Sequence, residues 1–466
     1  MPETQKPQLI KIRDDHEPIK LQRKNTDLRF PTFDVDASTP CPWAQRDIGT
    51  DKLRERIEPW LTALFQSEHL SLLVGSGMPI ALNTIAKAEA PSPMSAANFG
   101  SFTQQINAEA KRTATAAGRT AVNIEDQIRV ATDLLAGLRA LTSVPDTQVH
   151  KLVAEQVPLL ETAIEETLKN FSGSILGAEQ ALVQAPEASR EKAFQYLTSF
   201  LMSFASRTGT RDRLNIFTTN YDRYIEMGAD IAGLRLIDRF VGTLSPIFRS
   251  SRLDVDLHYN PPGIRGEPRF LEGVARFTKL HGSIDWASTG LTIRRMGLPF
   301  GTPSIAPFLT TGGGSSIKAN QLMIYPNSSK DRETAQYPYV ELFRDLSAAI
   351  CRPNCTLLTY GFSFGDEHIN RVIEDMLTIP STHLVVISRS DTLGRITKLY
   401  EKRPAQISLL IGDHLSSLEA LVDHYLPKPA IDKTTFRMAE LLKARFAVAR
   451  ATDSSDPVES DQGQRT

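Results

Sequence analysis

Short, continuously apolar runs recur along the chain, and segments with helical spacing separate them. Such runs are typical of strands buried on both faces, as in a parallel sheet that is covered by helices on each side. The sequence therefore predicts an α/β fold built on a doubly wound parallel sheet. The runs are LSLLV at 70–74, LNIFTT at 214–219, FTKL at 277–280, LMIY at 322–325, CTLLTYG at 355–361, HLVVIS at 383–388 and ISLLI at 407–411.

Residues 95–207 break this alternation, because they hold helical patterns and no convincing strand. Their apolar positions recur at the spacing of one helix face, which predicts a large all-helical insertion after the first strand. The apolar stripes form either a lid or packing layer, or a surface for oligomerisation or a partner. The positions are Ile124, Ile128, Ala131, Leu135 and Leu138; Leu160, Ile164 and Leu168; and Phe194, Leu197, Leu201 and Phe204.

The two ends of the chain differ from its middle. Residues 1–50 are rich in charge and proline, so we expect an N-terminal arm that wraps a surface. The last residues, ATDSSDPVESDQGQRT, hold almost nothing to bury, which favours disorder. We therefore expect a core of residues 51–94 and 208–426, the helical insertion at 95–207, and a C-terminal helix with a disordered tail at 427–466.

Charge and cysteine content narrow the class of protein. The chain has 53 basic and 54 acidic residues, so it lacks the net positive electrostatic field of a general nucleic-acid binder. The balance does not exclude a local basic groove. Three cysteines cannot make a four-thiolate zinc site, and their odd number argues against a disulfide framework. No window approaches the roughly 20 apolar residues of a membrane helix, and the N-terminus lacks a signal-peptide core. We expect a cytoplasmic protein that is not bound to a membrane and holds no metal.

A glycine corner follows the first apolar run. In LLVGSGMP, Gly75 and Gly77 flank Ser76 where a strand is expected to end. Glycines at such a corner let a diphosphate approach the backbone, and a following helix N-terminus offers free amides to the anion. The same pattern is also an ordinary tight turn.

The second strand end carries a polar cluster in NIFTTNYDRYIE. In an open α/β sheet, ligands bind outside the carboxyl ends of the strands, so Thr219, Asn220 and Asp222 are expected at a binding crevice. Asn220 offers a donor and an acceptor and Asp222 an acceptor, which together can orient a ribose, a carboxamide or a water. Alternatively, Asn220 or Asp222 is the N-cap of the helix that follows.

The third strand end places His281 before Gly282 in TKLHGSIDW. A histidine there can act as a general base or hold a sugar hydroxyl, because imidazole titrates near neutral pH. A lone histidine is more often structural, but this one follows two other strand ends with small polar clusters.

A second glycine and serine corner lies in TYGFSFGDEHIN, where Gly361, Ser363 and Gly365 follow a strand. This corner suits the other half of a dinucleotide, although Asp366 is equally well placed as the N-cap of the next helix. Two later strand ends are suited to contacts with an adenosine. They present Ser388 with Arg389, and Gly412 with Asp413.

The order Gly-Ser-Gly, Thr-Thr-Asn-Tyr-Asp, His-Gly, Gly-Phe-Ser-Phe resembles the Rossmann-like sirtuin fold in its bacterial sirtuin-like branch, over about residues 70–413. The resemblance implies NAD as the substrate and gives the matching residues roles. Gly75, Ser76 and Gly77 would contact the NAD diphosphate, and Gly361 and Ser363 would bind the phosphate and adenosine-ribose side. Asn220 would hold the attacking water or the nicotinamide ribose, and Asp222 would bind the nicotinamide carboxamide. His281 would hydrogen-bond the ribose hydroxyls and act as a base. Thr219 and Ser388 complete the predicted NAD-binding set.

The sequence also departs from deacylating sirtuins. Those enzymes carry two cysteine pairs on a zinc ribbon, whereas only Cys351 and Cys355 lie near each other here. The serine and the Pro-x-Phe-Arg segment after the glycine turn are replaced by Met78, Pro79 and Ile80. These differences favour plain NAD hydrolysis over peptide deacylation.

Zinc-free sirtuin-like proteins with helical insertions resemble bacterial antiphage effectors that destroy NAD. The resemblance therefore implies an NAD glycohydrolase that acts in abortive infection as a homo-oligomer, with a HerA-like hexameric ATPase or another phage-sensing partner. The alternatives are an NAD-dependent protein deacylase or ADP-ribosyltransferase with the same pocket, and a nuclease or binding subunit of an ATPase-containing defence complex.

Overall fold

The computed structural model describes residues 8–428, except for the short gaps given at the end of this paragraph. The predicted strand at 322–325 and all but the first two residues of the predicted C-terminal segment therefore lie outside the described residues. The gaps are 13–14, 26–30, 40, 44–45, 90–96, 117–121, 123, 146, 206, 208–210, 252–254, 260–268, 289–291 and 309–336.

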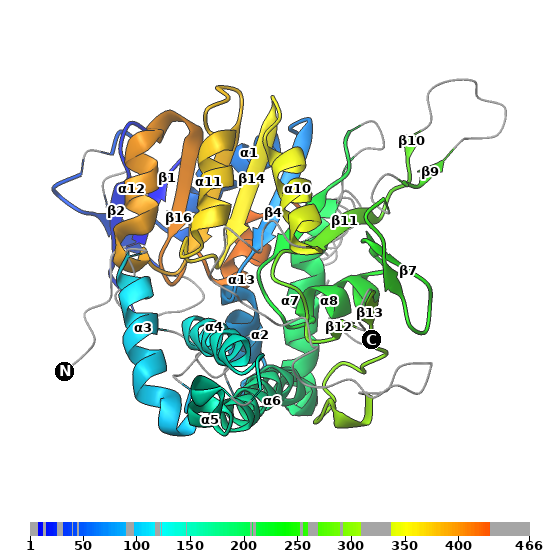
Figure 1. Ribbon diagram of the computed structural model, residues 1–466. Helices are drawn as coiled ribbons and strands as arrows, with labels where there is room; N and C mark the ends of the chain where they lie inside the picture. The colour runs from blue at the N-terminus through cyan, green and yellow to red at the C-terminus, as the bar shows by residue number, and fades with distance from the viewer. Residues whose placement is uncertain are drawn as a thin grey trace, which may run out of the picture. The chain divides into compact units, whose positions relative to one another are not determined.

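A ten-stranded sheet organises the described part of the chain, with strand order β3-β2-β1-β16-β15-β14-β4-β5-β11-β6. The seven strands from β16 to β6 are parallel, which confirms the predicted α/β fold with a parallel sheet (Figure 1). They are β4 (His69–Val74), β5 (Asn215–Thr218), β6 (Arg235–Ile237), β11 (Val274–Lys279), β14 (Cys355–Tyr360), β15 (His383–Ser388) and β16 (Ile407–Ile411).

The strand order changes direction at β4. The chain first adds β5, β6 and β11 on one side of β4, and later adds β14, β15 and β16 on the other. The crevice between the carboxyl ends of β4 and β14 is therefore a topological switch point, which is where ligands bind in open α/β sheets.

The segment predicted as an N-terminal arm contributes three strands to the sheet. They are β1 (Gln8–Lys11), β2 (Ile19–Arg23) and β3 (Phe33–Val35), and β1 pairs with β16 in antiparallel register. Their apolar side chains, including Ile10, Leu21 and Phe33, are fully buried in the core.

Helices cover both faces of the sheet, because successive side chains of each buried strand point to opposite faces. Leu72 and Val74 of β4 pack on one face, and Leu73 between them packs on the other. Figure 1 shows α10, α11 and α12 over the second face. The helices of the first face are α1 (Thr50–Phe65), α2 (Gly77–Ile85), α7 (Glu187–Ala205), α8 (Tyr224–Ala232), α13 (Leu418–Ala420) and η7 (Leu421–Tyr425). Those of the second face are α10 (Tyr339–Ile350), α11 (Glu367–Met376) and α12 (Arg395–Lys402).

The predicted insertion contains η1 (Gly100–Phe102), α3 (Thr103–Ala116), α4 (Ile124–Leu141), α5 (Gln148–Val153), α6 (Gln156–Gln184) and α7. The apolar stripes of α4 and α6 pack into a core of their own, which also holds Tyr221 and Ile284 from the loops after β5 and β11. The stripe of α7 packs instead on the sheet, with Leu197 and Phe204 in the first-face core. Helices α3 to α6 lie on the side of the sheet where β4 runs into α2 (Figure 1).

Besides β11, several smaller elements lie between β6 and α10. The strands β7 (Phe240–Val241), β8 (Ile247–Phe248), β12 (Trp286–Ser288) and β13 (Ile293–Arg295) form a second sheet, and β9 (His258–Tyr259) pairs with β10 (Arg269–Phe270). The remaining single turns are η3 (Ala306–Phe308), η5 (Thr392–Gly394) and η6 (Pro404–Gln406).

None of the helices in the described ranges is both long enough and apolar enough to span a membrane.

Candidate functional site

The two predicted glycine corners lie in direct backbone contact at the switch point. The amide of Gly75 donates to Tyr360 O at 2.9 Å, and the amide of Gly77 donates to Gly361 O at 3.1 Å. A Cβ on Gly77 would stand 2.6 Å from Gly361 Cα, and Gly361 has a φ of +61°. Side chains at these positions would push β4 and β14 apart, so glycine is required by packing as well as by any ligand.

This contact also limits how the first corner could hold a diphosphate. The amides of Gly75 and Gly77 already donate hydrogen bonds to carbonyls. A phosphate would therefore contact the exposed Ser76 and the glycine backbone atoms, which no side chain covers. The Ser76 side chain does not cap α2. The predicted roles of the three residues stay predictions.

Asn220 ties the end of β5 to the first glycine corner. Its Nδ2 donates to Gly75 O at 3.0 Å, its backbone amide donates to Thr218 Oγ1 at 3.0 Å, and its side chain is buried. Its Oδ1 has no hydrogen-bond partner among the described residues. Asn220 therefore has a fixed orientation and an acceptor to spare. Thr219 lies beside it, with its amide directed at Val74 O at 3.4 Å.

The alternative in which Asn220 or Asp222 is the N-cap of α8 is not what the structure shows, because Arg223 occupies the N-cap position. Asp222 Oδ1 accepts only a long hydrogen bond of 3.4 Å from the amide of Tyr224.

The Asp222 carboxyl lies in a partly buried, charged environment. Burial raises its pKa to about 7, and Lys279 opposes this shift while Glu179 and Glu226 add to it. The Lys279 ammonium is itself buried and donates to Asp222 O and, at 2.9 Å, to Glu226 Oε1. Near neutral pH the carboxyl can therefore both accept and donate a hydrogen bond, as recognition of a carboxamide requires.

His281 pairs with Asp366, for which the sequence predicted only a role as a helix N-cap. Its Nε2 lies 2.9 Å from Asp366 Oδ2, while Asp366 Oδ1 caps α11 by accepting from the amides of His368 and Ile369. The N-cap prediction for Asp366 is thus confirmed. The pair bridges β11 and β14, which are separated in the sheet by β4 and β5, so it spans the strand ends that carry the glycine corner and Asn220.

Tyr221 links Asn220, His281 and the helical insertion. It directly follows Asn220, and its ring centroid lies 6.3 Å from that of His281. Its hydroxyl donates to Glu125 Oε1 of α4 at 3.2 Å, and its ring meets Phe171 of α6 edge-on at 5.8 Å. Burial, with Glu125 as the next cause, raises the pKa of Tyr221 well above its ordinary value. The insertion therefore packs directly on the candidate site.

A buried ion pair fastens α6 beside Asp222. Glu179 accepts from the backbone amide of Arg223 at 2.9 Å and from its guanidinium at 2.5 Å. Arg223 also donates to the carbonyls of Leu298 and Pro299. Next to this pair, the Tyr224 hydroxyl donates to Ala178 O at 2.7 Å.

The residues predicted to bind the adenosine side, Ser363 and Ser388, lie at the carboxyl ends of two neighbouring strands, β14 and β15. Ser363 is exposed and lies beside Gly365, where a Cβ would stand 3.3 Å from Ser363 Oγ and 3.1 Å from Nη1 of Arg395. Ser388 ends β15, one strand farther along, and its buried hydroxyl donates to Ser390 O at 3.0 Å. Ser388 thus belongs to its own turn in this structure.

The cysteines are separate thiols. Cys355 Sγ donates to Ala349 O at 3.6 Å, and burial raises its pKa to about 12. Cys351 Sγ donates to Val372 O at 3.7 Å. Within the described ranges, no group of three or more histidine, cysteine or acidic side chains is arranged to hold a metal ion.

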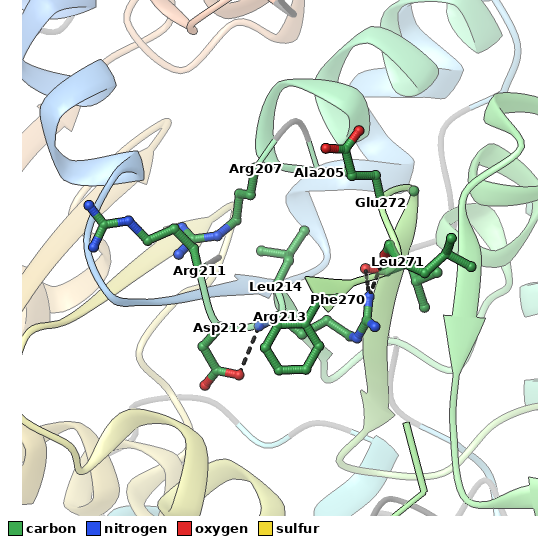
Figure 2. Close-up of a pocket in the computed structure, with 11 residues that line it drawn as sticks. Ala205, Arg207, Arg211, Asp212, Arg213, Leu214, Phe270, Leu271 and Glu272 are labelled. Atoms are coloured by element: carbon green, nitrogen blue, oxygen red, sulfur yellow. Dashed lines mark hydrogen bonds between the residues drawn. The ribbon is translucent and has the colours of Figure 1, made fainter. Parts of the chain in front are cut away.

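A pocket lies at the opposite edge of the sheet, at the amino ends of β5 and β11 (Figure 2). Three of its charged side chains bind other parts of the fold. The Arg213 guanidinium binds Asp256 Oδ1 and Leu271 O, Arg207 donates to Phe65 O, and Asp212 accepts from His69 Nδ1 at 2.8 Å. These contacts connect the ends of neighbouring strands, and the pocket is not part of the predicted site.

Fold and site together define a Rossmann-like α/β protein whose polar strand ends converge at a switch point. Residues 214–408 match the family model of the SIR2-like domain. This segment contains Asn220, His281, Gly361 and Asp366, whereas the first glycine corner lies before it. The match covers less than half of the chain and shows that this segment is similar to SIR2-like domains, which use NAD. No curated protein matches the chain.

Proposed function

We propose that this protein is an NAD glycohydrolase, which cleaves NAD to nicotinamide and ADP-ribose. The observation that carries the proposal is the convergence of four strand ends. Gly75, Asn220, His281 and Gly361 come from β4, β5, β11 and β14 and are linked through backbone, Asn220 and Tyr221 contacts.

The proposed reaction breaks the bond between the ribose C1′ and the nicotinamide nitrogen. The bonding pair leaves with nicotinamide, which becomes neutral, and the ribose passes through an oxocarbenium-like state. Water then adds at C1′ and loses a proton, to give ADP-ribose. Asn220 Oδ1 orients this water, and His281 holds a ribose hydroxyl and accepts a proton.

Asp222 is the group that we assign to the nicotinamide carboxamide. Because its pKa is raised to about 7, it offers a donor as well as an acceptor to the amide. Nicotinamide held in this way leaves from a fixed position.

The wider role that we propose is depletion of NAD in bacterial antiphage defence by abortive infection. The motif order and the helical insertion support it through their resemblance to antiphage effectors. A homo-oligomer and a HerA-like or other phage-sensing partner stay predictions of the same resemblance.

A protein deacylase or ADP-ribosyltransferase is the second candidate, because it would use the same NAD pocket. Release of free ADP-ribose without any acceptor separates hydrolysis from both transfers.

The test is incubation of the purified full chain with NAD, followed by measurement of nicotinamide and ADP-ribose. We expect Asn220→Ala and His281→Ala each to lower turnover at least about 10²-fold, since each removes a group that acts on water or ribose. The control is His16→Ala, which removes an exposed imidazole. Turnover retained in both site variants would contradict the assignment.

A further inference from the structure

The two oxygens of the Asp366 carboxylate have different hydrogen-bond partners. Oδ1 accepts from the amides of His368 at 2.9 Å and Ile369 at 3.3 Å, and Oδ2 lies 2.9 Å from His281 Nε2. Asp366 is 8% exposed, and the two amides at the start of α11 hold one side of its carboxylate. Its carboxylate therefore has little freedom to turn away from the imidazole.

This geometry determines which nitrogen of a neutral His281 carries the proton. A carboxylate only accepts hydrogen bonds, so Nε2 must donate to it. The lone pair of the neutral ring is then on Nδ1, which has no hydrogen-bond partner within the part of the chain that the structure describes. The N-terminus of α11 also favours a negative charge on its capping residue.

We propose that Asp366 is a positioning residue, which holds His281 as the Nε2–H tautomer and so presents Nδ1 as the proton acceptor. The inference rests on the proposed function and adds a residue to it. When Nδ1 accepts a proton from a ribose hydroxyl or the attacking water, an O–H bond breaks and an N–H bond forms. The imidazolium that results lies against the Asp366 carboxylate, which stabilises it without taking the proton.

The sharpest variant is Asp366→Asn. Asparagine caps a helix as well as aspartate does, so the fold of α11 is kept. Its amide NH₂, however, would face Nε2 and require an acceptor there, which moves the ring proton to Nδ1. The variant thus changes the tautomer and removes the charge at nearly constant shape.

Asp391→Asn is the matched control. Asp391 also uses its carboxylate at a helix N-terminus, accepting from the amides of Ile396 at 2.8 Å and Thr397 at 3.0 Å. It has no contact with His281, so its variant reports the effect of losing a capping charge alone.

The first readout does not depend on NAD cleavage. In protein labelled with ¹⁵N-histidine, long-range proton–nitrogen spectra distinguish the two tautomers, and the His281→Gln variant assigns the signal among the nine histidines. We expect Nε2–H in the wild-type protein and in Asp391→Asn, and Nδ1–H in Asp366→Asn. An Nδ1–H signal in the wild-type protein, or an unchanged tautomer in Asp366→Asn, would overturn the proposal.

The second readout is the rate of nicotinamide release as a function of pH. We expect Asp366→Asn to lower kcat by about 10²–10⁴-fold with KM changed less than about threefold, and to alter the pH profile. An unchanged kcat with a changed tautomer would refute a role in the reaction. If the tautomer changes in Asp366→Asn but the wild-type protein does not cleave NAD, the proposed function is refuted and the positioning of His281 by Asp366 still holds.

Discussion

At the scale of single residues, the candidate site is built from groups whose chemistry is set by their neighbours. The side-chain amide of Asn220 donates to Gly75 O, which leaves its Oδ1 as an acceptor, and His281 Nε2 is hydrogen-bonded to Asp366. The Asp222 carboxyl is desolvated by burial, accepts only one long hydrogen bond and lies near Glu179 and Glu226, so its charged form is disfavoured despite Lys279.

The raised pKa of Asp222 predicts a dependence of stability on pH. The pKa rises from 3.8 to about 7 in the folded protein, so between these values the folded state binds the extra proton. The free energy of unfolding therefore falls as the pH rises through this window, and the loss is complete above pH 7. Asp222→Asn removes this term, so its stability relative to wild type should improve by on the order of 2 kcal/mol between pH 5 and pH 8. Urea titrations at pH 5 and pH 8 measure the free energy of unfolding of both proteins. An equal change with pH in the variant and in the wild type would contradict the prediction.

At the scale of elements, α6 is the helix that joins the insertion to the site. Its Glu179 pairs with Arg223, the N-cap of α8, and its Phe171 packs on Tyr221. The insertion thus holds the two residues that flank Asp222, and Tyr221 also directly follows Asn220. Movement of α6 would be transmitted to the candidate site through these contacts.

Glu179→Gln tests this attachment. The variant leaves the buried Arg223 guanidinium without its ion-pair partner, which should lower the free energy of unfolding by about 3–5 kcal/mol. Glu161→Gln is the control on the same helix, since Glu161 pairs with Arg139 at 2.6 Å on the exposed surface and should contribute less than about 1 kcal/mol. Equal effects of the two variants in urea denaturation would show that Glu179 does not anchor the insertion.

At the scale of the whole molecule, the sheet continues beyond β16, its last parallel strand. The strand β1 pairs with β16, and Gln8 Oε1 accepts from the amides of His414 at 3.1 Å and Leu415 at 3.2 Å. The N-terminal segment therefore covers an edge that would otherwise expose unpaired backbone groups.

Deletion of residues 1–36 should accordingly expose the edge of β16 and remove buried side chains such as Ile10 and Phe33. We expect a large loss of thermal stability and aggregation, which size-exclusion chromatography and thermal unfolding measure. Lys24→Ala removes a half-exposed lysine from the same segment and serves as the control. A monomeric deletion variant that unfolds at the wild-type temperature would contradict the importance of this edge.

The sequence by itself determined six of the seven parallel strands, all except β6, and the polar residues at their ends. Apolar runs and the glycine and polar residues that follow them are local patterns, and the packing of a parallel sheet leaves them few alternatives. The carboxyl ends of such strands meet at one edge, so Gly75, Asn220, His281 and Gly361 could be assigned to one site before their contacts were known.

The tertiary structure alone decided which partners those residues have. His281 and Asp366 lie 85 positions apart, and Tyr221 and Glu125 lie 96 positions apart. Such pairs depend on loop courses and on how the insertion packs, and periodicity carries no information about either. The pairing of β1 with β16 likewise joins residues about 400 positions apart, because an uncovered sheet edge accepts any strand whose apolar side chains fit the core.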